Sequence, residues 1–261
     1  MSYPKYVVFT DVIRNETPIF EENTMHLIRN LAYSFMNAFH NKSKIDPETS
    51  DGMEILSLEG MTGIKTRHLY NNILGWFGNV KYLEIGTWYG SSSISALYKN
   101  TDISSALFID NWSQFNGNVD IFYNTMNKFK NKNDIISNFK ILESDCWKVD
   151  LSNIKESEFF NVYLYDGGHT ELDHYMSLAY YLPVLEDTFV FIVDDWNWPD
   201  VRDGTMRAIK EFNLDIKFRH DIFVSPEDNL GMPKTNLSKK TWWNGCCVFL
   251  LSKTFTNRIN T

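Results

Sequence analysis

Cysteine and long hydrophobic runs are both scarce in this sequence. Its 261 residues include three cysteines, too few for a disulfide framework, and the adjacent pair Cys246 and Cys247 cannot bridge without unusual backbone geometry. No stretch approaches the roughly 18 consecutive apolar residues of a membrane-spanning helix. The first residues also lack the basic start and apolar core of an export signal. We therefore expect a cytoplasmic protein that has no membrane partner.

Positive charge is scarce as well. Lysine and arginine number 25 against 33 aspartates and glutamates, which gives a formal net charge of −8. Because binding to a phosphate backbone needs a surplus of basic residues on one face, this balance disfavours a nucleic-acid partner. Hydrophobic residues make up 43% of the chain and aromatic residues 15%, which is typical of a packed globular protein rather than a disordered one.

The first candidate site, VKYLEIGTWYGSSSIS at Val80–Ser95, departs from the G-x-G-x-x-G fingerprint of dinucleotide-binding proteins. A short apolar run ends at an acid, Glu84, turns on Gly86 and Gly90 and enters a run typical of a helix. The glycines let the backbone turn sharply beside a ligand, and Ser91–Ser93 offer hydroxyl caps for the helix. An acid at this strand end would repel a pyrophosphate and attract an ammonium group.

This stretch resembles motif I of the class I S-adenosylmethionine-dependent methyltransferases, whose cofactor carries such an amino group. The resemblance implies a Rossmann-like three-layer α/β sandwich with a mostly parallel seven-stranded sheet. It also implies that the glycine turn and the start of the helix contact the cofactor. The residues concerned are Glu84, Gly86, Thr87, Gly90, Ser91 and Ser92.

Two further predicted strands contribute to the same site. Ser105–Asp110 ends in an acid about twenty residues after the glycine turn, where a carboxylate reaches a ribose diol in doubly wound sheets. The Trp112 indole, two residues later, is placed to stack on an adenine. Asn138–Leu142 forms the next strand, and in the resembled family the residues after it bracket the adenine amino group. The residues that complete the predicted cofactor site are Asp110, Asn111, Trp112, Asp145 and Cys146.

Acids also follow the two later predicted strands, FNVYLY and FVFIV. The first leads into Asp166 and the second into Asp194 and Asp195, and the single strand-helix crossover between them places both ends on one edge of the sheet. Three carboxylates repel one another unless a cation or protons intervene. Since Mg²⁺ prefers oxygen ligands, we predict all three acids as its ligands. The alternative is that Asp194 caps the following turn, Asp195 is solvated and only Asp166 is special.

His169 follows a Gly-Gly turn three residues after Asp166, and an unperturbed imidazole can take a proton near neutral pH. We predict that His169, or Asp166 itself, removes the proton of a reacting hydroxyl; the alternatives for His169 are a metal ligand and a helix cap.

Together with E-x-G-x-x-x-G and IDNW, the motifs DGGHT and DDW resemble the metal-dependent O-methyltransferases of the macrocin O-methyltransferase and cephalosporin-hydroxylase-like group. In that group the acids at these strand ends hold Mg²⁺ and a nearby residue is the base. The Gly-Gly-His departs from other members.

The predicted function is therefore an S-adenosylmethionine-dependent O-methyltransferase that acts on a hydroxyl of a small molecule or sugar, assisted by Mg²⁺. The catalytic domain is predicted at residues 60–261, after an N-terminal helical extension at residues 1–59. The alternatives are a nucleotide-binding oxidoreductase or hydroxylase-like protein, and a non-catalytic cofactor-binding module on the same fold.

Three peripheral segments carry weaker predictions. The apolar face of a helix starting near Glu21 either covers the sheet or binds a second subunit in a homo-oligomer. Arg67 and His68 are expected on a solvated helix face, the alternative being that they face the substrate. The long loop from Val224 to Gly245 is expected to close over the substrate with its two tryptophans, or to pack one of them in the core.

Overall fold

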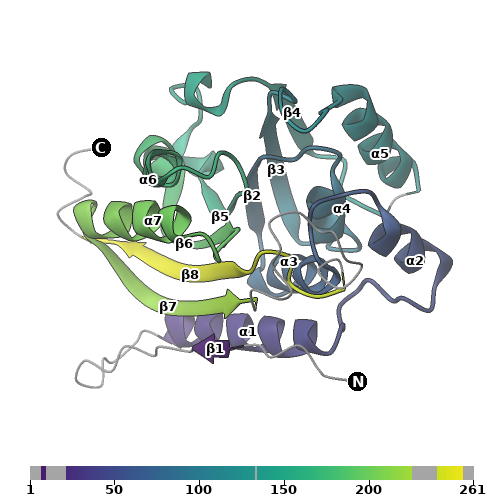
Figure 1. Cartoon of the computed structure of the whole chain (residues 1–261), viewed down its shortest axis with the longest axis horizontal. Helices are drawn as coiled ribbons and strands as arrows, with labels where there is room; N and C mark the ends of the chain where they lie inside the picture. The colour runs from purple at the N-terminus through teal and green to yellow at the C-terminus, as the bar shows by residue number, and fades with distance from the viewer. Residues whose placement is uncertain (1–6, 10–21, 133, 225–239, 255–261) are drawn as a thin grey trace.

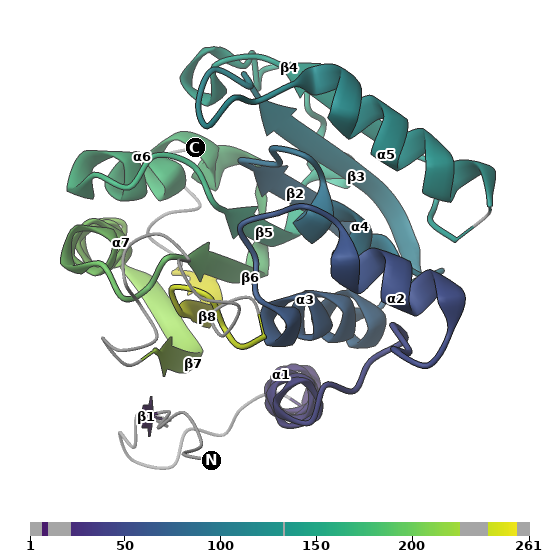
Figure 2. The ribbon, with the colours of Figure 1, turned by 45° about the vertical axis from the view of Figure 1, so that its right-hand side comes forward.

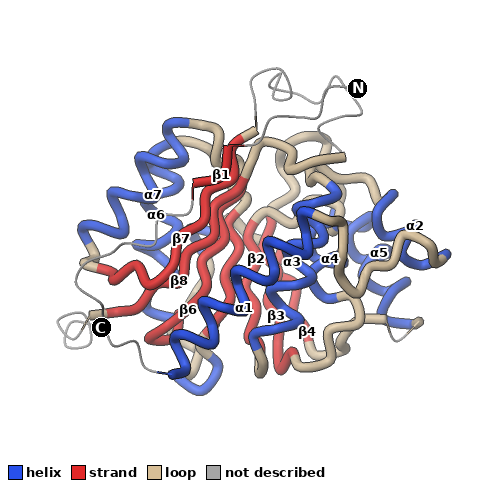
Figure 3. The backbone as a smooth tube through the Cα atoms, turned by 90° about the horizontal axis from the view of Figure 1, so that it is seen from below, coloured by secondary structure: helices blue, strands red, loops and turns tan. Residues whose placement is uncertain are grey.

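The computed structural model describes residues 7–9, 22–132, 134–224 and 240–254, and these form one mixed β-sheet with helices on both faces (Figures 1 and 3). The strands are β1 (Val7–Phe9), β2 (Val80–Ile85), β3 (Ile103–Asp110), β4 (Phe139–Glu143), β5 (Phe160–Tyr165), β6 (Leu185–Asp194), β7 (Leu214–Phe223) and β8 (Cys246–Lys253). The α-helices are α1 (Glu22–Phe39), α2 (Ser50–Ser57), α3 (Ile64–Phe77), α4 (Ser91–Leu97), α5 (Val119–Asn131), α6 (Glu171–Tyr181) and α7 (Pro199–Glu211). Short 3-10 helices lie at Cys146–Lys148, Glu156–Glu158 and Leu182–Val184.

The sheet has the order β1-β7-β8-β6-β5-β2-β3-β4. The strands from β6 to β4 in this order are mutually parallel, whereas β8 is antiparallel to both β6 and β7. The α/β prediction is confirmed: the seven predicted strands are β2 to β8. The edge strand β1 was not among the predicted strands; its Val7 pairs with Phe223 of β7. Five parallel strands thus bring their C-terminal ends to one edge of the sheet.

Two apolar layers separate the sheet from its helices. Side chains alternate between the faces of a strand, so Tyr82 of β2 packs toward α1, α3, α4 and α5, while Leu83 and Ile85 pack toward α6 and α7. In β6, the same alternation sends Val190 and Ile192 to the first layer and Phe191 and Val193 to the second.

Helix α1 lies beside α3 and reaches the sheet at β7 (Figure 2). Its apolar residues Leu31, Phe35 and Ala38 are buried in the same core as the sheet, and the Phe35 ring centroid lies 4.0 Å from that of His220. Met36 on its other face is half exposed. The helix therefore covers the sheet, which confirms the first of the two alternatives for it. A role in a homo-oligomer and the domain division at residue 60 stay predictions.

Helix α3 differs from expectation, because Arg67 and His68 are buried rather than solvated. The Arg67 guanidinium donates to backbone carbonyls, and the Ser43 hydroxyl lies 2.8 Å from His68 Nδ1. The helix is enclosed by α1 and α4 and shares the apolar core of the sheet. Its polar side chains Asn71 and Asn72 donate to backbone carbonyls inside the protein. Among the described residues, no helix is long and apolar enough to cross a membrane.

Candidate functional site

A cavity of about 480 Å³ opens at the C-terminal ends of the parallel strands. This volume is within the usual range for small-molecule sites. Residues that follow β2, β3, β4, β5 and β6 all contribute to its walls, so acids far apart in the sequence meet around one space. From the predicted site, the lining includes Gly86, Thr87, Ser91, Ser92, Asp110, Asn111, Asp145, Cys146, Asp166, His169 and Asp195. The predicted site residues that do not line it are Glu84, Gly90, Trp112 and Asp194.

The glycine turn after β2 forms the floor of the cavity. Gly86 has φ +86°, and a Cβ built there would lie 1.8 Å from the backbone oxygen of Asp166. Gly90 has φ +88° and precedes α4, where a Cβ would lie 3.0 Å from the ring of Phe122. Both positions therefore require glycine. The predicted serine caps are wrong, since α4 has no side-chain cap and its N-cap residue is Gly90.

Glu84 lies beneath this floor. Its carboxylate accepts hydrogen bonds from the Ser92 hydroxyl at 2.6 Å and the Tyr82 hydroxyl at 2.9 Å. The side chain is fully buried, and burial raises the pKa of Glu84 to about 7. Glu84 therefore does not line the cavity itself, whereas Ser92, which donates to it, does.

Asp110 ends β3 at the cavity wall. Its carboxylate accepts the backbone N–H of Trp88 at 2.8 Å and that of Trp112 at 2.7 Å. A carboxylate has about four acceptor positions, so two remain for a ligand. The Trp112 indole points away from the cavity: it packs on Phe122 and donates to the carbonyl of Trp88 at 2.6 Å. The aromatic residue of this loop that lines the cavity is instead Phe115.

Asp145 and Cys146 follow β4 on the same side of the cavity. The Asp145 carboxylate accepts the backbone N–H of Trp147 at 3.0 Å and pairs with Lys148 at 3.1 Å. The Trp147 hydrogen bond, followed by that of Lys148, lowers the pKa of Asp145. Burial raises the pKa of the Cys146 thiol to about 12, so it is not a nucleophile at neutral pH.

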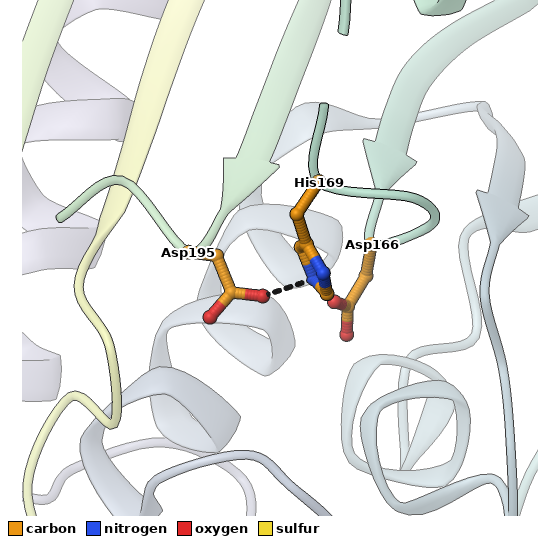
Figure 4. A group of neighbouring side chains, drawn as sticks. All are labelled: Asp166, His169 and Asp195. Carbon is orange, nitrogen blue, oxygen red and sulfur yellow. Dashed lines mark ion pairs between the residues drawn. The ribbon is translucent and has the colours of Figure 1, made fainter. Parts of the chain in front are cut away.

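The opposite side of the cavity holds an acid-histidine cluster of Asp166, His169 and Asp195 (Figure 4). One ligand atom from each of the three residues lies within 4.8 Å of the others. His169 Nε2 is 2.6 Å from Asp195 Oδ2, and this hydrogen bond raises the pKa of His169 against the effect of burial. Burial, with the charges of Asp194 and Asp195, raises the pKa of Asp166 well above its ordinary value.

Asp194 does not join the cluster, so its predicted place in the metal site is taken by His169. As the last residue of β6 it continues the Val190–Ile192 face and turns into the first apolar layer, where it is 2% exposed. Its Oδ1 accepts the N–H of Asp195 at 2.9 Å. Asp195 has a left-handed φ of +55°, and the chain turns there. Burial raises the pKa of Asp194 to about 8, followed by repulsion from Asp195.

Three residues around the cluster were not predicted as site residues. Trp198 stacks on the His169 ring with centroids 5.5 Å apart, and Asn244 donates to Asp195 Oδ1 at 2.5 Å. Trp243 lines the cavity and Trp242 is fully buried. Core packing is therefore confirmed for Trp242, and closure of the loop over a substrate stays a prediction. Residues 225–239 of the loop predicted to close over the substrate lie outside the described residues.

One buried polar atom of the lining has no protein partner. The Thr87 Oγ1 makes no hydrogen bond within the described part of the chain, although Thr87 is only 2% exposed. A buried hydroxyl without a partner is costly. The arrangement fits a ligand with polar groups that reaches the floor of the cavity beside Gly86.

Comparisons with known proteins give fold-level likenesses only. No family model matches the sequence, and no curated protein matches it. Among solved structures, a putative O-methyltransferase from Klebsiella pneumoniae is 11% identical with a TM-score of 0.48, over 90% of this chain and 92% of that one. The O-methyltransferase TomG of tomaymycin synthesis from Streptomyces achromogenes, in complex with S-adenosylmethionine, is 11% identical with a TM-score of 0.49, over 89% and 91%. A putative RNA methyltransferase from Pyrococcus horikoshii is 12% identical with a TM-score of 0.49, over 85% and 98%.

Proposed function

We propose that this protein is an S-adenosylmethionine-dependent methyltransferase that transfers a methyl group to a hydroxyl oxygen of a small molecule. One observation carries the proposal: a single cavity joins two chemically different walls. Asp110, Asp145 and the glycine turn form one wall, and the acid-histidine cluster forms the other. The first suits a nucleoside with an amino-acid tail, and the second suits a group that must lose a proton.

The residues of the first wall fit the cofactor, which when bound supplies an activated methyl group on its sulfonium. Asp110 keeps two acceptor positions for a ribose diol, because its other two are used by backbone N–H groups. The unpartnered Thr87 hydroxyl would be satisfied by a polar atom of the ligand. Asp145 is held by Trp147 and Lys148 and so presents a fixed carboxylate to the base-binding end.

The second wall can move a proton. His169 can accept the proton of the acceptor hydroxyl, and Asp195 at 2.6 Å would stabilise the imidazolium that forms. Trp198 stacked on the ring, together with the Asn244 amide on Asp195, holds this pair in place. Enclosure of the reacting groups in the cavity would align them, and alignment is a large part of the rate advantage in transfer reactions.

The acid-histidine cluster also fits a divalent cation. Asp166 and Asp195 offer the carboxylate oxygens that Mg²⁺ prefers, and the raised pKa of Asp166 among neighbouring carboxylates supports a cation between them. A bound cation would lower the pKa of a hydroxyl that it contacts. His169 then serves as the base or as a nitrogen ligand, and the two roles exclude each other.

The acceptor is proposed to be a small hydroxylated molecule rather than a nucleic acid. The net charge of −8 opposes a polyanion, and the reacting groups lie inside the cavity among Trp198, Trp243 and Asn244. Binding of RNA with a steep dependence on salt concentration would contradict this part of the proposal.

Cofactor binding is the first test. The melting temperature should rise with S-adenosylmethionine or S-adenosylhomocysteine and stay unchanged with NAD, because only a ligand of the native state stabilises it. Asp110→Ala should remove the rise, whereas Glu143→Gln, at an exposed strand end beside it, should not. A response to NAD alone would favour the oxidoreductase alternative.

Turnover is the second test. Methyl-labelled cofactor should transfer its label to members of a panel of sugars and phenols when the metal is present, and chelation should stop the transfer. Tight cofactor binding without transfer to any hydroxyl would favour the non-catalytic module. Asp166→Asn with unchanged turnover in metal-free buffer would show that the metal has no part in the reaction.

A further inference from the structure

Arg67 is a buried cation directly behind the cavity wall. Its side chain is 3% exposed, and within the described residues its acceptors are three backbone carbonyls and no carboxylate: Ile55 at 2.8 Å, Leu58 at 2.9 Å and Thr62 at 3.3 Å. Burial lowers the pKa of Arg67 to about 10, so the guanidinium remains charged at neutral pH. A buried charge that has only carbonyl partners is expensive, and this suggests a ligand of opposite charge nearby.

The loop held by Arg67 is fitted tightly against the cavity. A Cβ built on Gly60 would lie 1.8 Å from Ser91 Oγ and 3.1 Å from Arg67 Nη2, so the cation and the serine hydroxyl are close neighbours. A Cβ on Gly63 would lie 2.2 Å from the backbone oxygen of Thr241. The two glycines clamp the loop between α4 and the segment before β8. Between them, Met61 and Thr62 line the cavity.

Two adjacent serines of α4 thus have opposite charges behind them. Ser91 lies beside the Arg67 guanidinium, and Ser92 donates to the buried carboxylate of Glu84 at 2.6 Å. Both serines line the cavity, next to the unpartnered hydroxyl of Thr87. A ligand group that carries an anion and a cation on one carbon atom matches this arrangement: an α-amino acid head group.

We infer that Arg67 is the positioning residue that selects the carboxylate of the cofactor's amino-acid tail at the Thr62–Ser91 end of the cavity, opposite the ammonium end above Glu84. The inference rests on the proposed function. Arg67 acts in two ways. The hydrogen bonds of its guanidinium group fix the loop that carries Met61 and Thr62, and its charge favours an anion at the neighbouring hydroxyl groups. It does not itself line the cavity.

The test uses two ligands that differ only in the carboxylate: S-adenosylmethionine and decarboxylated S-adenosylmethionine, with dissociation constants measured by calorimetry on the full chain. The wild type should prefer the first by roughly tenfold or more, as expected for a charge a few ångströms away in a partly dry site. Arg67→Met should reduce this preference to about threefold or less, and Arg67→Lys should keep most of it because the charge remains.

Matched variants separate the charge from the fold. Lys65→Met removes one charge from the same helix without altering the cavity and should leave the preference unchanged. Glu84→Gln should weaken both ligands by the same factor, because both carry the ammonium group. Equal weakening of the two ligands by Arg67→Met would make Arg67 a purely structural residue and overturn the inference.

The wild-type measurement stands even where a variant fails to fold. Equal affinity of the wild type for the two ligands would overturn the inference while leaving the proposed function intact. Failure to bind S-adenosylmethionine, S-adenosylhomocysteine or the decarboxylated ligand would overturn the proposed function itself.

Discussion

The two walls of the cavity differ in how their acids are stabilised. In the proposed cofactor wall, formed by Asp110, Asp145 and the glycine turn, the two acids accept backbone N–H groups of neighbouring loops, and the pKa of Asp145 is lowered. In the acid-histidine wall, Asp166 lies among other carboxylates and its pKa is raised well above its ordinary value. The acids of the first wall have hydrogen-bond donors within the protein, whereas the acids of the second repel one another until a cation or a proton relieves the repulsion. Binding and chemistry are therefore assigned to different parts of one cavity.

The largest expected effect comes from breaking the acid-histidine wall alone. Asp166→Asn should lower kcat/KM by about a thousandfold or more, because it removes both a proposed metal ligand and a carboxyl group beside the proposed base. Cofactor affinity should change by less than about threefold, because the other wall is untouched. Labelled-methyl transfer and calorimetry measure the two effects. A loss of cofactor affinity as large as the loss of turnover would show that the walls are not separate.

The second prediction concerns the buried acid under the cofactor wall. The pKa of Glu84 is about 7 in the folded protein, above its ordinary value of 4.5. The protonated side chain therefore contributes fully to the free energy of unfolding below pH 4.5, and this contribution is lost as the pH rises through the folded-state pKa. At about pH 8, Glu84→Gln should therefore raise the free energy of unfolding of the ligand-free protein by roughly 2–3 kcal/mol. The gain should vanish near pH 4. Denaturant unfolding at both pH values measures it, with the exposed Glu143→Gln as the control. A gain independent of pH would contradict the assignment.

Breaking the cofactor wall should have a smaller effect. Asp110→Ala should weaken S-adenosylhomocysteine by roughly ten- to a hundredfold, the usual cost of losing a pair of hydrogen bonds to a charged group. Mn²⁺ affinity, followed by electron paramagnetic resonance, should be unchanged. A parallel loss of metal affinity would place Asp110 in the other wall.

The smallest effect is a titration. The hydrogen bond to Asp195 is the main cause of the raised pKa of His169, so Asp195→Asn should move the His169 titration to lower pH in an NMR experiment without metal. In the wild type, the His169–Asp195 ion pair stabilises the fold fully below the ordinary histidine pKa of about 6.5. This stabilisation is lost as the pH rises through the raised pKa of His169 in the folded protein. His174, whose pKa burial lowers to about 3, is an internal control that should remain neutral in both proteins.

Much of this arrangement could be predicted from the sequence. Apolar runs that end in acids locate β2, β3, β5 and β6, and parallel topology then brings their ends together, as observed for Asp110, Asp166 and Asp195. The direction of each acid was harder to predict. Glu84 and Asp194 share the strand face of Tyr82 and Ile192, but Asp110 shares that of Phe108 in the same way. The period of two alone therefore could not separate the buried acids from the acid that lines the cavity.

Other features depend on long-range packing. Nothing local in α3 indicates that Arg67 is enclosed, because its partners come from α2 and the following loop. Trp112 turns inward because its backbone has a left-handed φ of +48° and its ring packs on Phe122 of α5. Trp198 and Asn244 reach the cluster from segments that lie almost fifty residues apart in the sequence.

The contact of Gly86 with the backbone of Asp166 ties the two walls together mechanically. The space between the two loops leaves no room for a methyl group, and the N–H of Asp166 donates to the carbonyl of Ile85 at 2.9 Å. A ligand at the glycine turn therefore meets the backbone of Asp166, the first residue of the acid-histidine cluster. By thermodynamic reciprocity, any factor by which such a ligand changes cation affinity at the cluster equals the factor by which the cation changes the affinity of that ligand; the limit of about threefold expected for Asp166→Asn bounds this coupling.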